Sequence, residues 1–125
     1  MATLELNEQT LESTVNSNDI VLIDFWAPWC GPCKSFGPIY ETVSEQHKDM
    51  VFAKVNTEEE QAIAAHFQIR SIPTLMVFKE QIIVFAQPGM IPESGLTQLV
   101  EQVKTLDMDK VRADIAAAEA EQQNA

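Results

Sequence analysis

Apolar stretches alternate along the chain with segments in which apolar residues recur at helical spacing. Nearly continuous apolar runs occupy residues 20–26 and 51–55, and such runs are typical of strands covered on both faces of a sheet. Two further runs, residues 75–79 and 82–86, are separated only by residues 80–81, so we expect a hairpin. No glycine in that turn supplies the positive φ that a two-residue hairpin turn prefers.

Four segments around these strands are predicted to be helices. They cover residues 8–15, 30–47, 58–67 and 93–106. We expect Asn7 to cap the first of them, and Pro38 to kink the second because proline removes a backbone donor and crowds the preceding turn. Strands and helices alternate until the adjacent strand pair, which predicts the α/β class: a mixed central sheet flanked by helices on both faces.

The residues after position 106 form a separate segment. Asp107 is expected to cap an alanine-rich helix over residues 108–122. The apolar positions of this helix share one face: Met108, Val111, Ile115 and Ala118. A helix this short is marginal alone, so it either docks onto the domain or a second copy of the chain, or frays in solvent. We therefore divide the chain into a domain, residues 1–106, and a C-terminal helical extension, residues 107–125.

Composition and charge restrict the class of protein. With 125 residues, 46% of them apolar, the chain is long enough for one globular core. The formal net charge of −11 disfavours nucleic acids and anionic membranes as partners, since both bind basic patches. The first residues lack a basic segment followed by an apolar one, and no apolar run approaches the roughly 20 residues that span a bilayer. We therefore expect neither a secretory signal nor a membrane span.

The only two cysteines, Cys30 and Cys33, stand where the strand over residues 20–26 gives way to a helix. A lone pair at this spacing is typical of a catalytic or metal-binding site in a reducing compartment, for which we expect the cytoplasm. Cys30 lies at the positive end of the helix dipole, so we expect it exposed with a lowered pKa, and Cys33 shielded one turn inside. Gly31 keeps the approach to the sulfur open and Pro32 stiffens the spacer, so both should tune the reduction potential.

Asp24 is the one carboxylate in an otherwise apolar strand. Burial should raise its pKa, and Lys54 on the next predicted strand is the candidate partner. A carboxylate poised near neutrality could take the proton from Cys33 as this thiol attacks a mixed disulfide at Cys30. The alternative is a buried Asp24 that bonds to backbone or solvent without a catalytic duty.

The number and spacing of the cysteines and histidines disfavour a metal site. Two cysteines are half of a structural zinc site, and the only histidines, His47 and His66, are far away in sequence and match no zinc spacing. We therefore predict no metal and expect both histidines on helix surfaces. Pro73 opens a predicted strand, a position where the missing backbone donor is tolerated.

Residues 24–34, Asp-Phe-Trp-Ala-Pro-Trp-Cys-Gly-Pro-Cys-Lys, closely resemble the active-site segment of the thioredoxin family. Residues 69–75, Ile-Arg-Ser-Ile-Pro-Thr-Leu, resemble the family's second signature, and the similarity covers residues 3–106. The resemblance implies a thioredoxin fold and a protein-disulfide reductase, with Cys30 as the nucleophile and Cys33 as the resolving thiol.

The same resemblance implies roles for other residues. Asp24 would be the buried proton acceptor near Cys33, with Lys54 nearby, and the Ile72–Pro73 bond would be cis. The residues that would edge the substrate groove are Trp29, Ile72, Pro73, Gly89 and, where the family usually has a small residue, Met90.

Thioredoxins receive electrons from NADPH through a flavoprotein thioredoxin reductase. The resemblance therefore implies this reductase and disulfide-containing proteins as partners, and no bound cofactor. We expect a monomer, with a dimer through residues 108–122 as the alternative. Two other roles stay open: a non-redox assembly or processivity partner that uses the same groove, and an oxidant or isomerase of the same fold. The Gly31-Pro32 spacer resembles that of reductants, so reduction is the function we expect.

Overall fold

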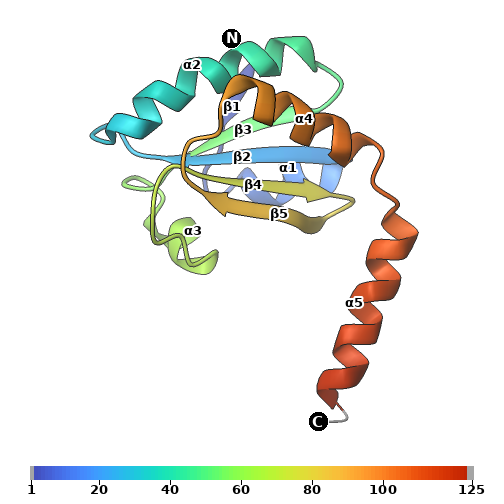
Figure 1. Cartoon of the computed structure of the whole chain (residues 1–125). Helices are drawn as coiled ribbons and strands as arrows, with labels where there is room; N and C mark the ends of the chain where they lie inside the picture. Colours follow the sequence, from blue (N-terminus) through green and yellow to red (C-terminus); the bar gives the residue numbers. More distant parts are fainter. Residues whose placement is uncertain (1, 124–125) are drawn as a thin grey trace.

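The computed structural model describes residues 2–123, and at its centre is a five-stranded sheet (Figure 1). The strands are β1 (Thr3–Glu5), β2 (Ile20–Trp26), β3 (Val51–Asn56), β4 (Thr74–Lys79) and β5 (Ile82–Pro88). Their order across the sheet is β1-β3-β2-β4-β5. β1, β3 and β2 run parallel, whereas β4 is antiparallel to both β2 and β5. The predicted mixed sheet is confirmed.

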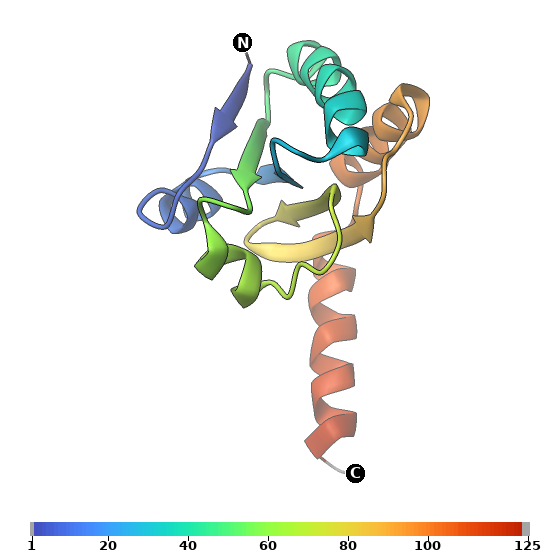
Figure 2. The same cartoon turned by 90° about the vertical axis from the view of Figure 1, so that its left-hand side faces the viewer.

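Helices cover both faces of this sheet. These helices are α1 (Leu11–Ser17), α2 (Gly31–Gln46), α3 (Gln61–His66) and α4 (Glu93–Lys104), and a further helix, α5 (Met108–Gln123), follows them. Figures 1 and 2 show α2 and α4 on one face and α1 and α3 on the other. This arrangement confirms the predicted α/β class, because connections between parallel strands cross over a face of the sheet and bring helices with them.

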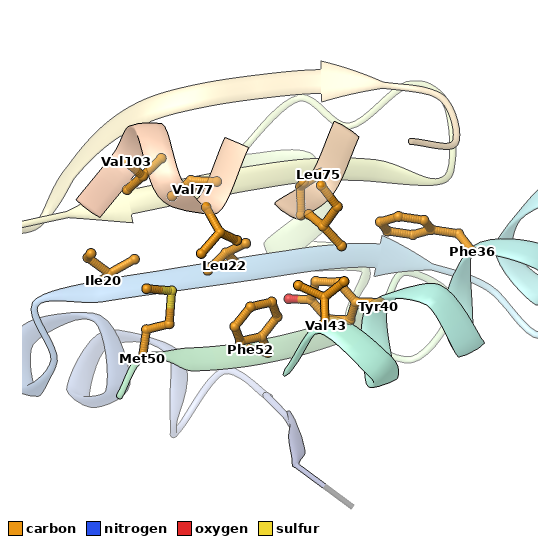
Figure 3. Close-up of a cluster of buried hydrophobic side chains, with 12 residues drawn as sticks. Ile20, Leu22, Phe36, Tyr40, Val43, Met50, Phe52, Leu75, Val77 and Val103 are labelled. Atoms are coloured by element: carbon orange, nitrogen blue, oxygen red, sulfur yellow. The ribbon is translucent and has the colours of Figure 1, made fainter. Parts of the chain in front are cut away.

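Alternate side chains of β2 enter two separate hydrophobic clusters. Leu22 packs with Tyr40 and Phe52 between the sheet and the pair α2 and α4 (Figure 3). Ile23 packs on the opposite face, where Val15 of α1 contributes to the second cluster. Because both faces of β2 are buried, nearly every position of this strand is apolar, as the sequence pattern indicated.

One strand was not predicted, and two helices begin later than predicted. β1 was not predicted, because three residues near the chain end carry too short a pattern. α1 begins at Leu11 rather than at residue 8, since the Asn7 side chain accepts hydrogen bonds from the amides of Gln9 and Thr10 and holds a turn before the helix. α3 begins three residues later than predicted, because Asn56 accepts from the amide of Glu58 and holds a turn there as well.

The predicted hairpin between β4 and β5 is confirmed, although its turn holds no glycine. Glu80 has a φ of 50° and Gln81 a φ of 69°, so both turn residues adopt the left-handed conformation. Two consecutive residues with positive φ are the signature of a type I′ turn, whose twist matches that of the flanking strands.

His47 does not lie on a helix surface as predicted. It follows the last residue of α2 and is 8% exposed, and its Nδ1 lies 3.1 Å from Nζ of Lys104. A tertiary contact buries His47: α2 and α4 lie on the same face of the sheet, and the end of α4 lies against the residue that follows α2. His66 is exposed at the end of α3, as predicted. α2 continues through Pro38 to Gln46.

α5 leaves the domain after its first turns (Figures 1 and 2). Oδ1 of Asp107 accepts a hydrogen bond of 3.2 Å from the amide of Lys110, which confirms the predicted cap. Met108 is buried, and Arg112 forms an ion pair of 2.6 Å with Glu80 in the hairpin turn. Ile115, further along the stripe, is 38% exposed. Residues 124–125 of the predicted extension lie outside the described residues.

Candidate active site

Cys30 and Cys33 form a disulfide at the junction of β2 and α2. Cys30 is the N-cap of α2, and its Sγ accepts a hydrogen bond of 3.1 Å from the amide of Cys33. The Cα atoms of the two residues are 5.2 Å apart, a separation that one helical turn provides. Pro32 stands in the first turn of α2, where its missing amide leaves no helical bond unmade. The predicted placement of the pair at a strand–helix junction is confirmed.

Both sulfurs are shielded, and the prediction of an exposed Cys30 is wrong for this disulfide form. Cys30 is 4% exposed and Cys33 5% exposed. They form a small buried cluster with Ala27, against which Trp26 and Ile72 pack. Sγ of Cys30 lies 3.7 Å from the carbonyl oxygen of Ile72, so the loop before β4 covers it. Sequence spacing places a cysteine on a helix end but does not show which distant loop packs over it.

The loop before β4 contains Ile72 and Pro73, two of the residues expected around a substrate groove, and it contacts the segment after β5. The Ile72–Pro73 peptide bond is cis. The carbonyl oxygen of Pro73 accepts a hydrogen bond of 2.8 Å from the amide of Gly89, which follows β5. Gly89 has a φ of 98°, a conformation that glycine adopts without strain. Met90, next in the chain, is 45% exposed. The structure thus joins the Pro73 and Gly89 segments beside the disulfide.

Trp29 is the largest exposed apolar side chain at this site, at 65% exposed. Its indole Nε1 donates a hydrogen bond to Oε1 of Glu58, in the turn before α3. Glu58 does not stand out in the sequence, because three successive glutamates are typical of the acidic first turn of a helix. No signal in the sequence distinguishes the one that holds the indole.

Asp24 is almost fully buried, with 1% of its surface exposed. Neither carboxylate oxygen has a hydrogen-bond partner among the described residues. Burial raises the pKa of Asp24 from its ordinary value of 3.8 to about 7, against the opposing effect of the Lys54 charge. The predicted cause, desolvation, is therefore confirmed, and the carboxyl changes charge near neutral pH.

Lys54 acts on Asp24 through space rather than through a hydrogen bond. The two residues are partners in the register of β2 and β3. Nζ of Lys54, however, lies 4.7 Å from the centroid of the Trp26 ring, a cation–π distance. Because the indole attracts the ammonium, the positive charge stays close enough to lower the pKa of Asp24 without satisfying its oxygens.

The described residues offer no group of three or more His, Cys, Asp or Glu side chains that could hold a metal ion. Within residues 2–123, none of the helices combines the length and the apolar character needed to cross a membrane.

Comparison with known proteins gives consistent results. A family model described as thioredoxin matches residues 2–105. A Streptomyces coelicolor protein named as a thioredoxin is 52% identical over 120 residues, which cover 96% of this chain and 90% of that protein. Thioredoxin 1 of Nostoc is 39% identical over 103 residues, covering 81% of this chain and 96% of that protein.

Solved structures agree with these sequence relatives. A mutant thioredoxin from Halobacterium salinarum superimposes with a TM-score of 0.78 at 38% identity, covering 84% of this chain and 93% of that one. Plasmodium falciparum thioredoxin superimposes with a TM-score of 0.74 at 35% identity, covering 79% of this chain and 97% of that one.

Proposed function

Because the chain belongs to the thioredoxin family, it is a dithiol–disulfide oxidoreductase that reduces protein disulfides by thiol–disulfide exchange, and we propose that Cys30 and Cys33 divide this reaction between them. Cys30, as a thiolate, attacks one sulfur of a substrate disulfide and forms a mixed disulfide, while the other substrate sulfur leaves. Cys33 then attacks Cys30 and releases the second substrate thiol. The substrate gains two electrons, and the pair ends as the Cys30–Cys33 disulfide.

The observation that carries this assignment is the hydrogen bond of 3.1 Å from the Cys33 amide to Sγ of Cys30. Cys30 is the N-cap of α2, so unpaired amides and the positive end of the helix dipole face its sulfur. Both stabilise a thiolate and lower the pKa of the thiol, which makes Cys30 the attacking group. Gly31 and Pro32 fix the geometry of the turn and so tune the reduction potential of the pair.

Asp24 accepts the proton that Cys33 loses when it attacks. With a pKa of about 7, its carboxyl is part ionised at neutral pH, where a general base works best. Cys33 is held in the disulfide in this structure, and once it is a thiol its proton passes to Asp24 directly or through a water molecule. The nearby charge of Lys54 opposes the effect of burial and keeps the pKa of the carboxyl from rising further.

The substrate chain lies along the surface formed by Trp29, Ile72, Pro73, Gly89 and Met90. Trp29 and Met90 are the exposed apolar members of this set, so they contact substrate side chains. The flexible thioether of Met90 adapts to different apolar neighbours and influences which substrates fit.

The wider setting follows from the family. Reducing equivalents come from NADPH through a flavoprotein thioredoxin reductase, in a reducing compartment such as the cytoplasm. The domain spans residues 1–106 and works as a monomer. Residues 107–125 are an extension of that domain, and the burial of Met108 against its own chain supports this assignment.

Single substitutions of the two cysteines test the division of labour. Cys33→Ser should accumulate a covalent complex with a disulfide substrate through Cys30, because nothing resolves the mixed disulfide. Cys30→Ser should form no such complex and should lose insulin reduction. Mass spectrometry and an insulin turbidity assay read the two outcomes, and undiminished turnover by Cys30→Ser would overturn the proposal.

A further inference from the structure

Three charged residues form a row across the parallel half of the sheet. Glu5 of β1 is the register partner of Lys54 in β3, and Lys54 is the register partner of Asp24 in β2. Residues in register on neighbouring strands point to the same face. Lys54 therefore stands between two carboxylates, a buried one and one at the sheet edge.

The face of the sheet that carries this row is the one under α2. Thr3, two positions before Glu5, donates a hydrogen bond to Glu41 of α2. Leu22, two positions before Asp24, packs against α2 as well. Side chains two residues apart on a strand share a face, so Glu5 and Asp24 both lie on the α2 side.

Glu5 also connects this row to solvent. It lines a surface recess together with Asn7, Trp26 and Glu59. The Lys54 ammonium lies over the Trp26 ring, which lines this recess. The same cation therefore lies close to the recess and to the buried carboxyl of Asp24. Glu5 is an exposed residue, but desolvation where it lines the recess raises its pKa, whereas Lys54 lowers it.

We propose that Glu5 is a positioning residue for the reductase reaction: it shares Lys54 with Asp24 and thereby sets how tightly Asp24 holds the proton taken from Cys33. This inference rests on the role proposed above for Asp24. Its physical basis is competition, because a negative charge at Glu5 both draws on the one nearby cation and repels a second negative charge on Asp24.

Other charged groups around the row do not replace Glu5. Glu59, before α3, also faces Glu5 and is held by a hydrogen bond from Asn56. Glu41 of α2 is engaged by Ala2 and Thr3 at the other end of β1. Tyr40 of α2 lies near Asp24, but burial raises the pKa of its phenol above its ordinary value of 10, so the phenol stays neutral. Among the described residues, Lys54 lowers and Glu5 raises the pKa of Asp24, beside the larger effect of burial.

The expected size of the effect follows from the sheet. Neighbouring strands lie about 4.8 Å apart, so the backbones of Glu5 and Asp24 are separated by about 10 Å. Screened charges at this separation should change the pKa of Asp24 by about half a unit. Glu5→Gln should therefore lower the pH at which Asp24 ionises by about that amount.

The experiment combines a titration with a rate. NMR of the Asp24 carboxyl carbon across the neutral range gives its midpoint. Stopped-flow reaction of the reduced protein with an aromatic disulfide gives the rate at which Cys33 resolves the mixed disulfide, because that step does not depend on reagent concentration. The rate is measured across the same pH range, which gives a second midpoint. In Glu5→Gln the NMR midpoint and the rate midpoint should fall together. Resolution at a pH below the wild-type midpoint should then become about threefold faster.

Two variants serve as controls. Glu5→Asp keeps the charge and should keep both midpoints near those of the wild type. Glu12→Gln removes the same charge from α1, on the opposite face of the sheet, and should also leave them unchanged.

Three outcomes would overturn the inference. It fails if Glu5→Gln leaves the Asp24 titration where it was, whatever the rates do. It also fails if Glu12→Gln shifts that titration as much as Glu5→Gln. If the titration moves and the resolution rate does not follow, it is the proposed role of Asp24 that fails, and the positioning role of Glu5 fails with it.

Discussion

The ammonium of Lys79 donates a hydrogen bond of 2.7 Å to the carbonyl oxygen of Val103, joining the end of β4 to the end of α4. It donates two more, each of 3.1 Å, to the carbonyl oxygens of Lys104 and Leu106. These carbonyls belong to the last turn of α4 and the residues after it, where a helix leaves acceptors without internal partners. A cation placed there also complements the negative end of the helix dipole, so Lys79 fixes the point from which α5 departs.

Lys79→Met should lower the free energy of unfolding by about 2–3 kcal/mol, because one buried and two part-buried carbonyls lose a charged donor while the aliphatic stem is kept. Urea denaturation measures this change. Lys110→Met is the matched control, since Lys110 forms only an exposed ion pair with Asp114 and should cost under about 0.5 kcal/mol. Equal effects of the two substitutions would show that the Lys79 bonds do not stabilise the junction.

The buried carboxyl of Asp24 should make the stability of the fold depend on pH. Its pKa is raised from 3.8 to about 7, so between these values the folded chain holds a proton that the unfolded chain has lost. The unfolding free energy of the wild type should therefore fall as pH rises through this window, by about 4 kcal/mol in all. Asp24→Asn lacks this titration, so its stability relative to the wild type should increase with pH up to neutrality. Urea titrations at several pH values check the slope, and parallel profiles for the two proteins would contradict it.

Asp24→Asn should also slow the second chemical step and spare the first. Without a proton acceptor, Cys33 must lose its proton to bulk water, so resolution of the mixed disulfide should slow by about tenfold or more at neutral pH. Stopped-flow measurements separate this phase from the initial attack of Cys30, which depends on reagent concentration. Unchanged resolution in Asp24→Asn would remove Asp24 from the mechanism.

The sequence was sufficient to predict most of the elements and the position of the cysteine pair. The central strands are apolar throughout, and a run such as residues 20–26 has few alternatives to a strand covered on both faces. The position of the cysteine pair also depends only on local sequence, because its spacing and the strand–helix junction are both determined by neighbouring residues. Asp24 could be singled out for the same reason, as a lone carboxylate in an apolar run.

What the sequence did not predict depends on contacts between distant segments. Burial of Cys30 comes from Ile72, and burial of His47 comes from the end of α4. The bond from Trp29 to Glu58 joins two loops that follow different strands. β1 was missed because its partner, β3, lies far along the chain and its own pattern is only three residues long. Local periodicity carries no information about such pairings.

Anchoring of α5 should depend mainly on Met108 in its first turn, because the ion pair of Arg112 with Glu80 is exposed and contributes little. Met108 is 5% exposed, so Met108→Ala should cost about 2 kcal/mol or more of unfolding free energy through lost packing. Ile115→Ala, on the same stripe, should cost much less, because Ile115 remains 38% exposed. Chemical denaturation compares the two, and gel filtration shows whether Ile115 instead supports a dimer. A large loss of stability in Ile115→Ala that depends on protein concentration would contradict the assignment of α5 as an extension of a monomer.

The hairpin turn offers a substitution that should stabilise the protein. Gln81 has a φ of 69°, where a side chain is strained and glycine is not. Gln81→Gly should therefore raise the free energy of unfolding by up to about 1 kcal/mol and leave Glu80 free to keep its ion pair with Arg112. Gln81→Ala keeps the strain of a side chain and should give no gain. The turn lies at the end of β4 that Lys79 occupies, away from the disulfide, so insulin reduction by Gln81→Gly should match the wild type. A loss of stability in Gln81→Gly equal to that in Gln81→Ala would mean that side-chain contacts of Gln81, rather than its backbone conformation, decide the energy of this turn.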